Sequence, residues 1–518
     1  MSTTPEQIVD WLRAHAPAAG LSSDSRSIAA GDVFFAYPGD AADGRRFIDD
    51  AIERGAVAIV CEAEAEAEGV ARHGPAGFPL LAVVDLKACA GFVAALWYGQ
   101  AGPALWTVAV TGTNGKTSCS QWLAAALSRL TGPCAVIGTL GTGLFRRGSV
   151  DQLAETGYTT PDAILLQRRL RDLRLAGATA LAIEASSIGL DQGRLNGLPV
   201  RTALFTNFTR DHLDYHGDMA TYEAAKTTLF DQPGLQHAVL NLDDAMGLRL
   251  LAHLQRSAPQ LTLIGYTLAA AAETGPAPAG IIVLRAGDIR SSHAGTSFQL
   301  STPDGTMLVR SRLVGRFNVS NVLGIIGVLL GQGHALRAIV DAIEALTAVP
   351  GRMQQFGGQD APLVVIDYAH TPDALEKTLA ALRQVADQRH GKLWCVFGCG
   401  GDRDPGKRPQ MGLAALAADE VIITSDNPRS EAAAEIIAQI LCGTKSRADS
   451  HAAPRVVEDR AAAILWAVRH AGNADVILVA GKGHENSQEV RGKKLPFLDA
   501  DHAALALATR ATHKGTRV

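Results

Sequence analysis

The stretch Trp106-Thr107-Val108-Ala109-Val110-Thr111-Gly112-Thr113-Asn114-Gly115-Lys116-Thr117 decides the fold class of this chain. The run from Trp106 to Val110 is mostly apolar and predicts a buried strand, and the apolar residues between Ser118 and Leu130 recur at helical spacing. A glycine loop between a strand and a helix turns backbone N–H groups toward an anion, and the helix N-terminus adds partial positive charge. We therefore predict a phosphate-binding loop, with contacts from Gly112, Thr113, Asn114, Gly115, Lys116, Thr117 and Ser118.

Two side chains of this loop indicate what it binds. Lys116 supplies a mobile positive charge for outer phosphates, and the Thr117 hydroxyl is placed to ligate Mg²⁺. The match to the general pattern is incomplete, because Val110 stands where that pattern has glycine. A glycine-rich turn without a ligand is the alternative, but Gly-Lys-Thr between a strand and a helix favours the phosphate site.

Composition excludes several classes of protein. The chain has 518 residues, of which 47% are hydrophobic and 19% charged, so it can bury several large cores. A net charge of −4 argues against nucleic-acid binding through bulk electrostatics. Seven scattered cysteines without metal-ligand spacing predict free thiols in a reducing cytoplasm. Neither a signal core nor an apolar run of membrane length is present, so we expect no membrane insertion.

Short apolar runs alternate with helical patterns along the chain, which predicts an α/β protein of three domains. We place these domains at residues 1–100, 101–348 and 349–518. The predicted strands are Val33–Ala36, Ala56–Val60, Ala180–Ile183, Ala203–Thr206, Ala238–Leu240, Leu363–Ile366, Leu393–Phe397, Val421–Thr424 and Val476–Val479. The last four predict a Rossmann-like, doubly wound parallel sheet. We expect surface segments at the Glu/Ala repeat Glu62–Glu68 and at Ala269–Gly280, and a frayed tail at His513–Val518.

Three residues of the middle segment are candidates for chemistry. Glu184 ends an apolar strand, where a Mg²⁺ ligand beside a phosphate loop is expected, although a solvated acid would also fit. His212, taken alone, is more typical of a hydrogen-bonded structural histidine. Lys226 shares a helical face with Tyr222, Leu229 and Phe230, so it either extends to water or has been chemically changed.

Together these residues resemble the Mur ligase family, ATP-dependent amide-bond formers of peptidoglycan precursor synthesis. The shared motifs are Thr111-Gly112-Thr113-Asn114-Gly115-Lys116, the strand-end Glu184, Asp211-His212-Leu213-Asp214 and Ala225-Lys226-x-x-Leu229-Phe230. The resemblance implies ATP and Mg²⁺ as cofactors and a central P-loop ATPase domain. It implies catalytic roles for Lys116, Lys226, Glu184 and His212, and a metal region of Thr117, Glu184, His212 and carbamylated Lys226.

The same resemblance assigns further nucleotide contacts to Asn318 and Asn321 in Arg316-Phe317-Asn318-x-x-Asn321, to Arg352, and to Asp367 in Asp367-Tyr368-Ala369-His370. From the sequence alone, the asparagines could be ordinary helix-start residues and Asp367 a strand-end acid. A uridine-nucleotide end is implied by Ser23-Asp24-Ser25-Arg26, through Ser23 and Ser25. The rest of a site for UDP-MurNAc-L-Ala-D-Glu is implied at Thr159, Thr160, Ser186, Gln192 and Arg194, with Ile188 where many relatives have histidine.

The last domain carries motifs that resemble a site for meso-diaminopimelate: Arg403, Asp426, Asn427, Pro428, Arg429, Gly481 and Glu485. This amino acid needs cations for two carboxylates and an acceptor for its distal ammonium. Arg403 and Arg429 supply planar forks suited to carboxylates, and Glu485 can accept from the ammonium. An isolated arginine is more often a partner in a surface ion pair, but Asp-Asn-Pro-Arg after a buried strand favours the ligand site.

The resemblance implies a monomeric ligase that phosphorylates the D-glutamyl carboxylate and joins the resulting acyl phosphate to one amine of diaminopimelate. The sequence names no convincing general base for that amine. Two alternatives stay open. A folate polyglutamylating ligase shares the ATPase core but has no reason to carry Asp-Asn-Pro-Arg, and a P-loop nucleotide switch would make no amide product.

Overall fold

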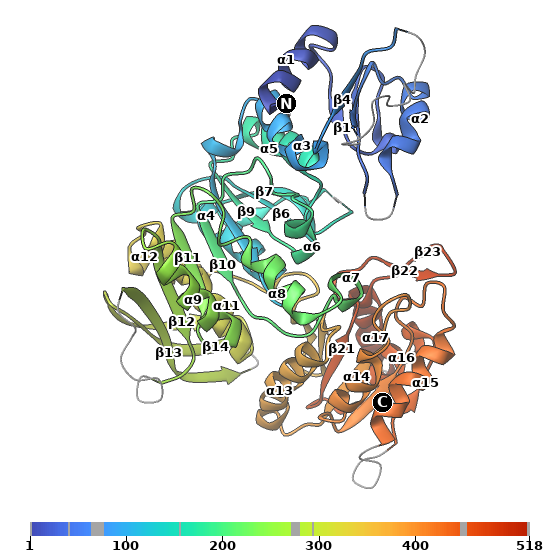
Figure 1. The fold of residues 1–518 in the computed structure, drawn as a ribbon. Helices are drawn as coiled ribbons and strands as arrows, with labels where there is room; N and C mark the ends of the chain where they lie inside the picture. The colour runs from blue at the N-terminus through green and yellow to red at the C-terminus, as the bar shows by residue number, and fades with distance from the viewer. Residues whose placement is uncertain are drawn as a thin grey trace.

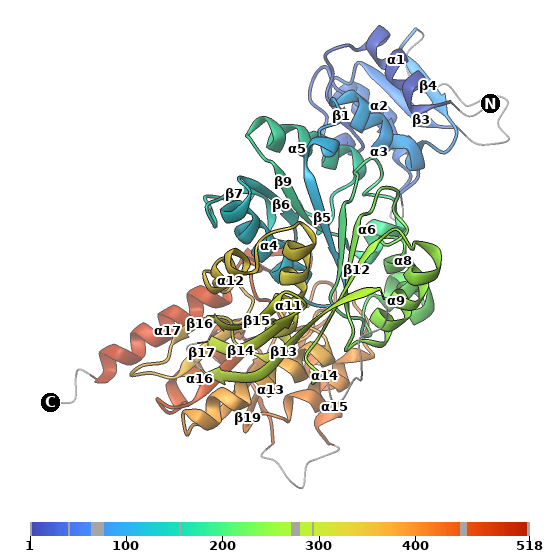
Figure 2. The same ribbon diagram turned by 90° about the vertical axis from the view of Figure 1, so that its left-hand side faces the viewer.

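The computed structural model describes residues 3–39, 42–63, 77–154, 157–270, 280–292, 295–445 and 453–514. Three α/β domains follow one another along the chain, with the second between the first and the third (Figure 1, and turned by 90° in Figure 2). Most of the Glu/Ala repeat, residues 271–279 and the last four residues lie outside the described parts, so the surface segments and the frayed tail stay predictions. Among the described residues, no helix is long and apolar enough to cross a membrane.

The first domain is a four-stranded parallel sheet in the order β1-β2-β3-β4. Its strands are β1 (Leu21–Ser22), β2 (Val33–Ala36), β3 (Ala58–Glu62) and β4 (Leu80–Val83). Its helices are α1 (Pro5–His15), α2 (Ile48–Glu53) and α3 (Leu86–Trp97), with 3₁₀ turns η1 (Ser25–Ser27) and η2 (Gly44–Phe47). α1 and α3 cover one face and α2 the other. The strand predicted at Val33–Ala36 is confirmed, and the next begins at Ala58, two residues later than predicted.

The central domain is built on an eleven-stranded sheet in the order β15-β14-β13-β12-β11-β10-β5-β9-β6-β7-β8. The strands are β5 (Trp106–Thr111), β6 (Cys134–Gly138), β7 (Gly141–Arg146), β8 (Ser149–Val150), β9 (Ala180–Glu184), β10 (Thr202–Phe205), β11 (His237–Asn241), β12 (Thr262–Thr267), β13 (Ile281–Ser292), β14 (Gly295–Thr302) and β15 (Gly305–Ser311). β5 lies between β10 and β9, parallel to both, so the loop after it opens at the carboxyl edge of the sheet.

Helices cover both faces of this sheet. They are η3 (Gly102–Ala104), α4 (Lys116–Leu130), α5 (Ala163–Leu175), α6 (Ser187–Asp191), α7 (Leu213–His216), α8 (Met219–Thr227), α9 (Ala245–Ser257), α11 (Arg316–Gly331) and α12 (Leu336–Glu344). α4, α11 and α12 share one core, and α5 and α9 share the core on the other face. α4 begins at Lys116, two residues before the predicted start, because Gly115 adopts a positive φ of 88° directly in front of it.

The sequence analysis missed the antiparallel parts of this sheet. β6, β7 and β8 form one antiparallel edge, and β13, β14 and β15 form the other. The latter strands bury only some of their side chains, so they lack the continuous apolar runs by which the parallel strands were predicted.

The third domain has a six-stranded sheet in the order β16-β17-β21-β18-β19-β20. The strands are β16 (Gln354–Gly357), β17 (Leu363–Asp367), β18 (Leu393–Phe397), β19 (Glu420–Ile423), β20 (Arg455–Val456) and β21 (Val476–Ala480), and a separate hairpin pairs β22 (Ser487–Val490) with β23 (Lys493–Pro496). The helices are α13 (Pro372–Gln388), α14 (Lys407–Ala415), α15 (Ala433–Thr444), α16 (Arg460–His470) and α17 (Asp499–Lys514).

The predicted doubly wound arrangement is confirmed, with α13, α14 and α15 on one face and α16 and α17 on the other. All four predicted strands exist, each within one residue of its predicted bounds. The sheet is not wholly parallel, however, since the edge strand β16 runs antiparallel to β17. An edge strand buries fewer side chains, and β16 has no buried residue, which explains why its sequence gave no apolar signal.

Candidate functional site

The loop between β5 and α4 has the shape that its sequence predicts. The N–H groups of Thr113 and Asn114 donate to Asn207, at its carbonyl oxygen (2.8 Å) and its side-chain oxygen (2.9 Å). Gly112 has a φ of 147°, and a side chain there would collide with the Thr206 hydroxyl, so the position requires glycine.

Lys116 lies folded over this loop. Its Nζ donates to the carbonyl oxygens of Gly112 (2.7 Å) and Thr113 (2.8 Å). Burial lowers the pKa of Lys116, and the negative charge of Glu184 works against that shift. The side chain is therefore held where its charge can meet an anion bound at the loop.

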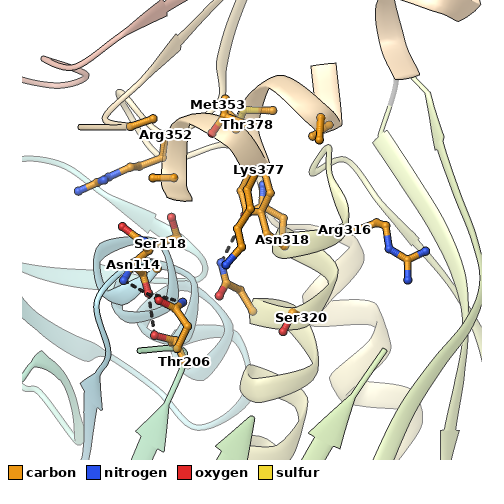
Figure 3. A pocket seen from close by; sticks show the side chains of 18 of the residues that line it. Asn114, Ser118, Thr206, Arg316, Asn318, Ser320, Arg352, Met353, Lys377 and Thr378 are labelled. Carbon is orange, nitrogen blue, oxygen red and sulfur yellow. Dashed lines mark hydrogen bonds between the residues drawn. The ribbon is translucent and has the colours of Figure 1, made fainter. Parts of the chain in front are cut away.

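A cavity of about 470 Å³ lies beside the loop, between the central and third domains. It brings together many of the residues predicted for ATP: Asn114, Gly115, Ser118, Asn318, Asn321, Arg352 and Asp367. Figure 3 shows Arg352, Met353, Lys377 and Thr378 on one side of it, and Asn114, Ser118, Asn318 and Ser320 on the other. The other predicted residues, Gly112, Thr113, Lys116 and Thr117, belong to the loop itself and do not line the cavity.

The cavity also contains polar residues that the sequence analysis missed. They include Asn207, Asn241, Asp243, Asp244, Lys377 and Thr378. Asp243 and Asp244 follow β11 after one intervening residue, Leu242, so their place at the carboxyl end of a parallel strand could have indicated them. Lys377 carried no signal, because it is an ordinary lysine of an amphipathic helix, where it pairs with Asp373 at 2.9 Å.

Glu184 and Thr117 are brought together on one side of the loop. Glu184 is fully buried, and its Oε2 accepts from the Thr117 hydroxyl at 3.1 Å. Thr139, which the sequence analysis missed, donates to Glu184 through both its backbone N–H (2.8 Å) and its hydroxyl (3.0 Å). Arg352 of the third domain donates to the Thr117 hydroxyl at 3.0 Å. The carboxylate is therefore fixed in position by groups around it.

His212 and Lys226 lie together at another place, around Tyr222. The Lys226 Nζ lies 4.4 Å from the centre of the Tyr222 ring, and the His212 ring lies edge-on to it at 6.1 Å. Lys226 is 1% exposed and donates to the Gly112 carbonyl oxygen at 3.1 Å. Burial, and then the charge of Lys116, lower its pKa far below the ordinary value. Burial also lowers the pKa of His212 to about 4, so its imidazole is neutral at pH 7.

The donor set around the loop suits Mg²⁺ held jointly with a nucleotide. Among the described residues, no group of three or more histidines, cysteines, aspartates or glutamates could hold a metal ion alone. Mg²⁺ prefers oxygen ligands and is commonly bound through one or two carboxylates plus substrate phosphates. The buried Glu184 carboxylate and the Thr117 hydroxyl fit that pattern. In this structure, no hydrogen bond or ion pair joins this pair to His212 or Lys226 among the described residues.

The residues predicted for the dipeptide form one hydrogen-bonded cluster. The Thr160 hydroxyl donates to the Glu184 carbonyl oxygen (2.8 Å) and contacts the Ser186 hydroxyl (3.0 Å). Arg194 donates to the Thr160 carbonyl oxygen (2.7 Å) and to the Gln192 side chain (2.8 Å).

The remaining residues of this prediction lie at the edges of the cluster. The Thr159 hydroxyl lies 3.0 Å from the Thr139 hydroxyl, which in turn donates to the Glu184 carboxylate. Ser23 of the first domain donates to Asp162 at 3.0 Å, while Ser25 is buried in η1 within the first domain. The cluster thus extends from Glu184 toward the first domain.

The predicted amino-acid site gathers around two loops of the third domain. A side chain on Gly400 would lie 2.9 Å from Arg429 Nη1 and 3.8 Å from Arg403 Cγ, so both arginines flank this glycine. Arg429 donates to the Gly401 carbonyl oxygen at 2.6 Å. Arg403 is exposed.

Lys482 belongs to the motif Gly481-Lys482-Gly483-His484-Glu485, in which the sequence analysis gave it no role of its own, and it lies at the other end of this site. It is fully buried, and its Nζ donates to Asn427 Oδ1 (3.0 Å), Glu485 Oε2 (2.8 Å) and the Ser487 carbonyl oxygen (2.7 Å). Asn427 in turn donates to Glu485 at 2.7 Å. Burial alone would raise the pKa of Glu485, but the charge of Lys482 and the hydrogen bonds from Lys482 and Asn427 together hold that pKa below its usual value.

Asp426 and Gly481 lie behind these residues. Asp426 is buried, its Oδ1 accepts from the Asn427 N–H at 2.7 Å, and Arg460 lies 4.0 Å away. A side chain on Gly481 would collide with Asp426. A side chain on Gly401 would likewise collide with the Pro428 carbonyl oxygen. Close packing around the site therefore leaves no room for a side chain at Gly401 or Gly481.

The central and third domains meet directly at the loop. Asn114 donates to Asp373 at 3.4 Å, and Arg210 pairs with Asp404 at 3.4 Å. His370 lies against Asp211, with Nε2 3.8 Å from the carboxylate, and it does not line the nucleotide cavity as Tyr368 and Ala369 do. The third domain therefore both closes the cavity and carries the two-arginine site.

This fold and site define a class: a three-domain P-loop protein in which the third domain closes the cavity beside the loop and carries a separate cluster of charged residues. Comparison with known families agrees. Residues 17–87 match the Mur ligase family catalytic domain, 110–329 the Mur ligase middle domain, and 351–483 the Mur ligase glutamate ligase domain. The chain belongs to the Mur ligase family.

Individual relatives extend this match to nearly the whole chain. The chain is 62% identical to the UDP-N-acetylmuramoyl-L-alanyl-D-glutamate–2,6-diaminopimelate ligase of Janthinobacterium sp. (strain Marseille), over 98% of both chains. It is 53% identical to the ligase of the same name from Ralstonia nicotianae, over 98% of this chain and 96% of the relative. A solved structure of a ligase of that name superposes with a TM-score of 0.65 at 37% identity, covering 95% of each chain.

Proposed function

We propose that this chain is an ATP-dependent acid–amino-acid ligase that joins meso-diaminopimelate to UDP-MurNAc-L-Ala-D-Glu in peptidoglycan precursor synthesis. The observation that carries the proposal is the position of the third domain, which closes the phosphate-loop cavity and presents Arg403 and Arg429 around Gly400. High identity over nearly the full length of the relatives favours this reaction over folate polyglutamylation or a nucleotide switch. We assign the three domains to residues 1–100, 101–348 and 349–518, in the order UDP-MurNAc, ATP and amino-acid binding.

The reaction has two steps. The γ-phosphoryl group of ATP moves to the free side-chain carboxylate of the D-glutamyl residue and gives an acyl phosphate. The neutral form of one amine of diaminopimelate then attacks the acyl carbon: the C–N bond forms, the acyl C–O bond breaks, inorganic phosphate leaves with the electron pair of that bond, and the nitrogen loses one proton. Closure of the third domain on the central domain excludes water that would hydrolyse the acyl phosphate.

The nucleotide is held by the loop and the cavity. Lys116 offsets negative charge on the transferred phosphoryl group, and Asn318, Asn321, Arg352 and Asp367 contact the adenosine side. Thr117 and Glu184 would hold Mg²⁺, and His212, which lies beside Tyr222, is a neutral imidazole at pH 7. When bound, Mg²⁺ supplies positive charge that stabilises the phosphoryl oxygens.

Lys226 acts as a carbamate. A buried ammonium beside Lys116 is unfavourable, and the lowered pKa favours the neutral amine. The neutral amine adds to CO₂ to give an N-carboxylate, and one proton is released to solvent. The product is an anion close to the loop, which suits a metal region better than a second cation does.

The acceptor substrate lies along the cluster of Thr159, Thr160, Ser186, Gln192 and Arg194, with its uridine end at Ser23 and Ser25. This placement is supported by the Ser23–Asp162 contact between the first and central domains. Thr160 is bonded to the backbone of Glu184, so a glutamyl carboxylate bound there lies beside the metal region. Ile188 cannot act as an acid or base, so its position contributes only contact.

The amino-acid site should prefer meso-diaminopimelate to L-lysine. The two differ chiefly in the distal carboxylate, which we assign to Arg429, while Arg403 takes the carboxylate that both share. Removing one partner of a close charge pair costs about 2–5 kcal/mol, and the lower end corresponds to a roughly 30-fold loss. We expect at least this ratio in kcat/KM, measured for both amino acids on the wild-type enzyme.

The matched variant is Arg429→Ala. It should lose most activity with diaminopimelate without becoming a good lysine ligase, because Glu485 recognises only the ammonium that both amino acids carry. Equal kcat/KM values on the wild-type enzyme would show that Arg429 does not recognise the second carboxylate.

We also propose that the enzyme acts as a monomer in the cytoplasm. All seven cysteines are free thiols, which suits a reducing compartment. ATP and the nucleotide-linked substrate are cytoplasmic metabolites, and the proposed site needs no residue from a second chain. Sedimentation of the purified protein at assay concentration tests the monomer.

A further inference from the structure

The carboxylate of Glu489 lies beside the guanidinium that the proposed function assigns to the ligand. Glu489 belongs to β22, and its Oε2 lies 3.6 Å from Arg429 Nε. The contact is partly open to solvent, since 34% of the Glu489 side chain and 22% of the Arg429 side chain are exposed. A carboxylate of an incoming amino acid would therefore compete with Glu489 for the same cation.

Backbone hydrogen bonds hold Glu489 in this place independently of its charge. Its N–H donates to Asn427 Oδ1 at 3.0 Å, and its carbonyl oxygen accepts from the Arg429 N–H at 3.0 Å. The Arg491 N–H donates to the Arg429 carbonyl oxygen at 2.7 Å, so Arg429 is bonded to the strand on both sides of Val490. Removing the charge of Glu489 leaves this framework intact.

The hairpin offers the displaced carboxylate a second cation. In the β22–β23 register, Glu489 lies directly opposite Lys494, which is exposed. Residues directly opposite in an antiparallel pair project from the same face and lie within interaction distance. The Glu489 carboxylate can therefore move away from Arg429 and still lie next to a positive charge, that of Lys494.

We propose that Glu489 is a specificity-determining residue, an internal counter-ion of Arg429 that a ligand carboxylate must displace. The inference rests on the proposed function. Diaminopimelate brings its own carboxylate, so competition with Glu489 weakens its binding. L-Lysine brings none, so Arg429 stays paired with Glu489 and the cost of an unmatched guanidinium is reduced. Glu489 therefore lowers the ratio of kcat/KM for diaminopimelate to kcat/KM for L-lysine.

The Glu489→Gln variant tests this directly, because it removes the charge and keeps the size of the side chain. A partly exposed ion pair contributes modestly, so the diaminopimelate-to-lysine ratio of kcat/KM should rise about two- to fivefold. The rise should come mainly from a lower KM for diaminopimelate. Glu6→Gln, which removes an exposed carboxylate in the first domain, is the control and should leave the ratio unchanged.

Two results would overturn the inference. A parallel fall in kcat/KM for both amino acids would show that Glu489 binds the ammonium they share, and an unchanged ratio would show that it does not compete at Arg429. Glu489→Ala repeats the test if glutamine disturbs the hairpin, with thermal unfolding as the check on folding. A wild-type enzyme that accepts neither amino acid would instead count against the proposed function.

Discussion

Lys116→Ala should abolish ligation while leaving the protein folded. Lys116 Nζ donates to the Gly112 and Thr113 carbonyl oxygens, so its loss removes positive charge at the phosphate loop. Single electrostatic groups of this kind contribute about 10²- to 10³-fold in other active sites, so we expect a fall in kcat of at least ~10²-fold. Phosphate release with both substrates present measures it.

The control for this variant is Lys445→Ala, which removes an exposed lysine of the third domain and should keep full activity. Thermal unfolding and binding of UDP-MurNAc-L-Ala-D-Glu should be close to wild type in both proteins. Near-normal ligation by a folded Lys116→Ala protein would contradict the assignment of the loop.

Lys226→Ala should be nearly inactive, with a loss of at least ~10²-fold, because it removes the anion that we place beside the loop as a carbamate. The Lys226 amine over the Tyr222 ring is almost fully buried, so the variant leaves a space that a small carboxylate can fill. Added acetate should therefore restore part of the activity of Lys226→Ala.

Dependence on CO₂ separates the carbamate from a purely structural lysine. Wild-type activity should fall in buffer freed of CO₂ and return with bicarbonate, whereas Lys226→Ala should not respond to bicarbonate. Full activity without CO₂, with an unmodified amine in substrate-bound crystals, would refute the carbamate.

The sequence predicted many of the parallel strands, because buried parallel strands are apolar along most of their length, but it missed β6 and β12, which are also buried and pair in parallel with β9 and β11. β5, β9, β17, β18 and β21 are fully or almost fully buried, and each was found from its run of apolar residues. β13 and β16 were missed because they lie at or near sheet edges with half-exposed side chains. Such strands depend on pairing with their neighbours, which composition does not reveal.

The residues of the candidate site also fall into a group that the sequence predicted and a group that it did not. Residues in the loop and in strand-end motifs were predicted, because their spacing carries a chemical reason, as for Lys116 and Glu184. Lys377, Lys482 and Thr139 were not assigned to a site: Lys377 is an ordinary lysine of an amphipathic helix, and Thr139 and Lys482 acquire their positions through contacts far along the chain. Thr139 bonds to Glu184 and Lys482 to Asn427, contacts that only the folded sheets bring together.

The central claim is tested most directly by incorporation of labelled meso-diaminopimelate into UDP-MurNAc-L-Ala-D-Glu by the purified enzyme. We predict a single UDP-linked product that forms only when ATP is present, with one phosphate released for each amino acid incorporated. ATP hydrolysis without any labelled product, or incorporation that does not need the UDP-linked acceptor, would contradict the account.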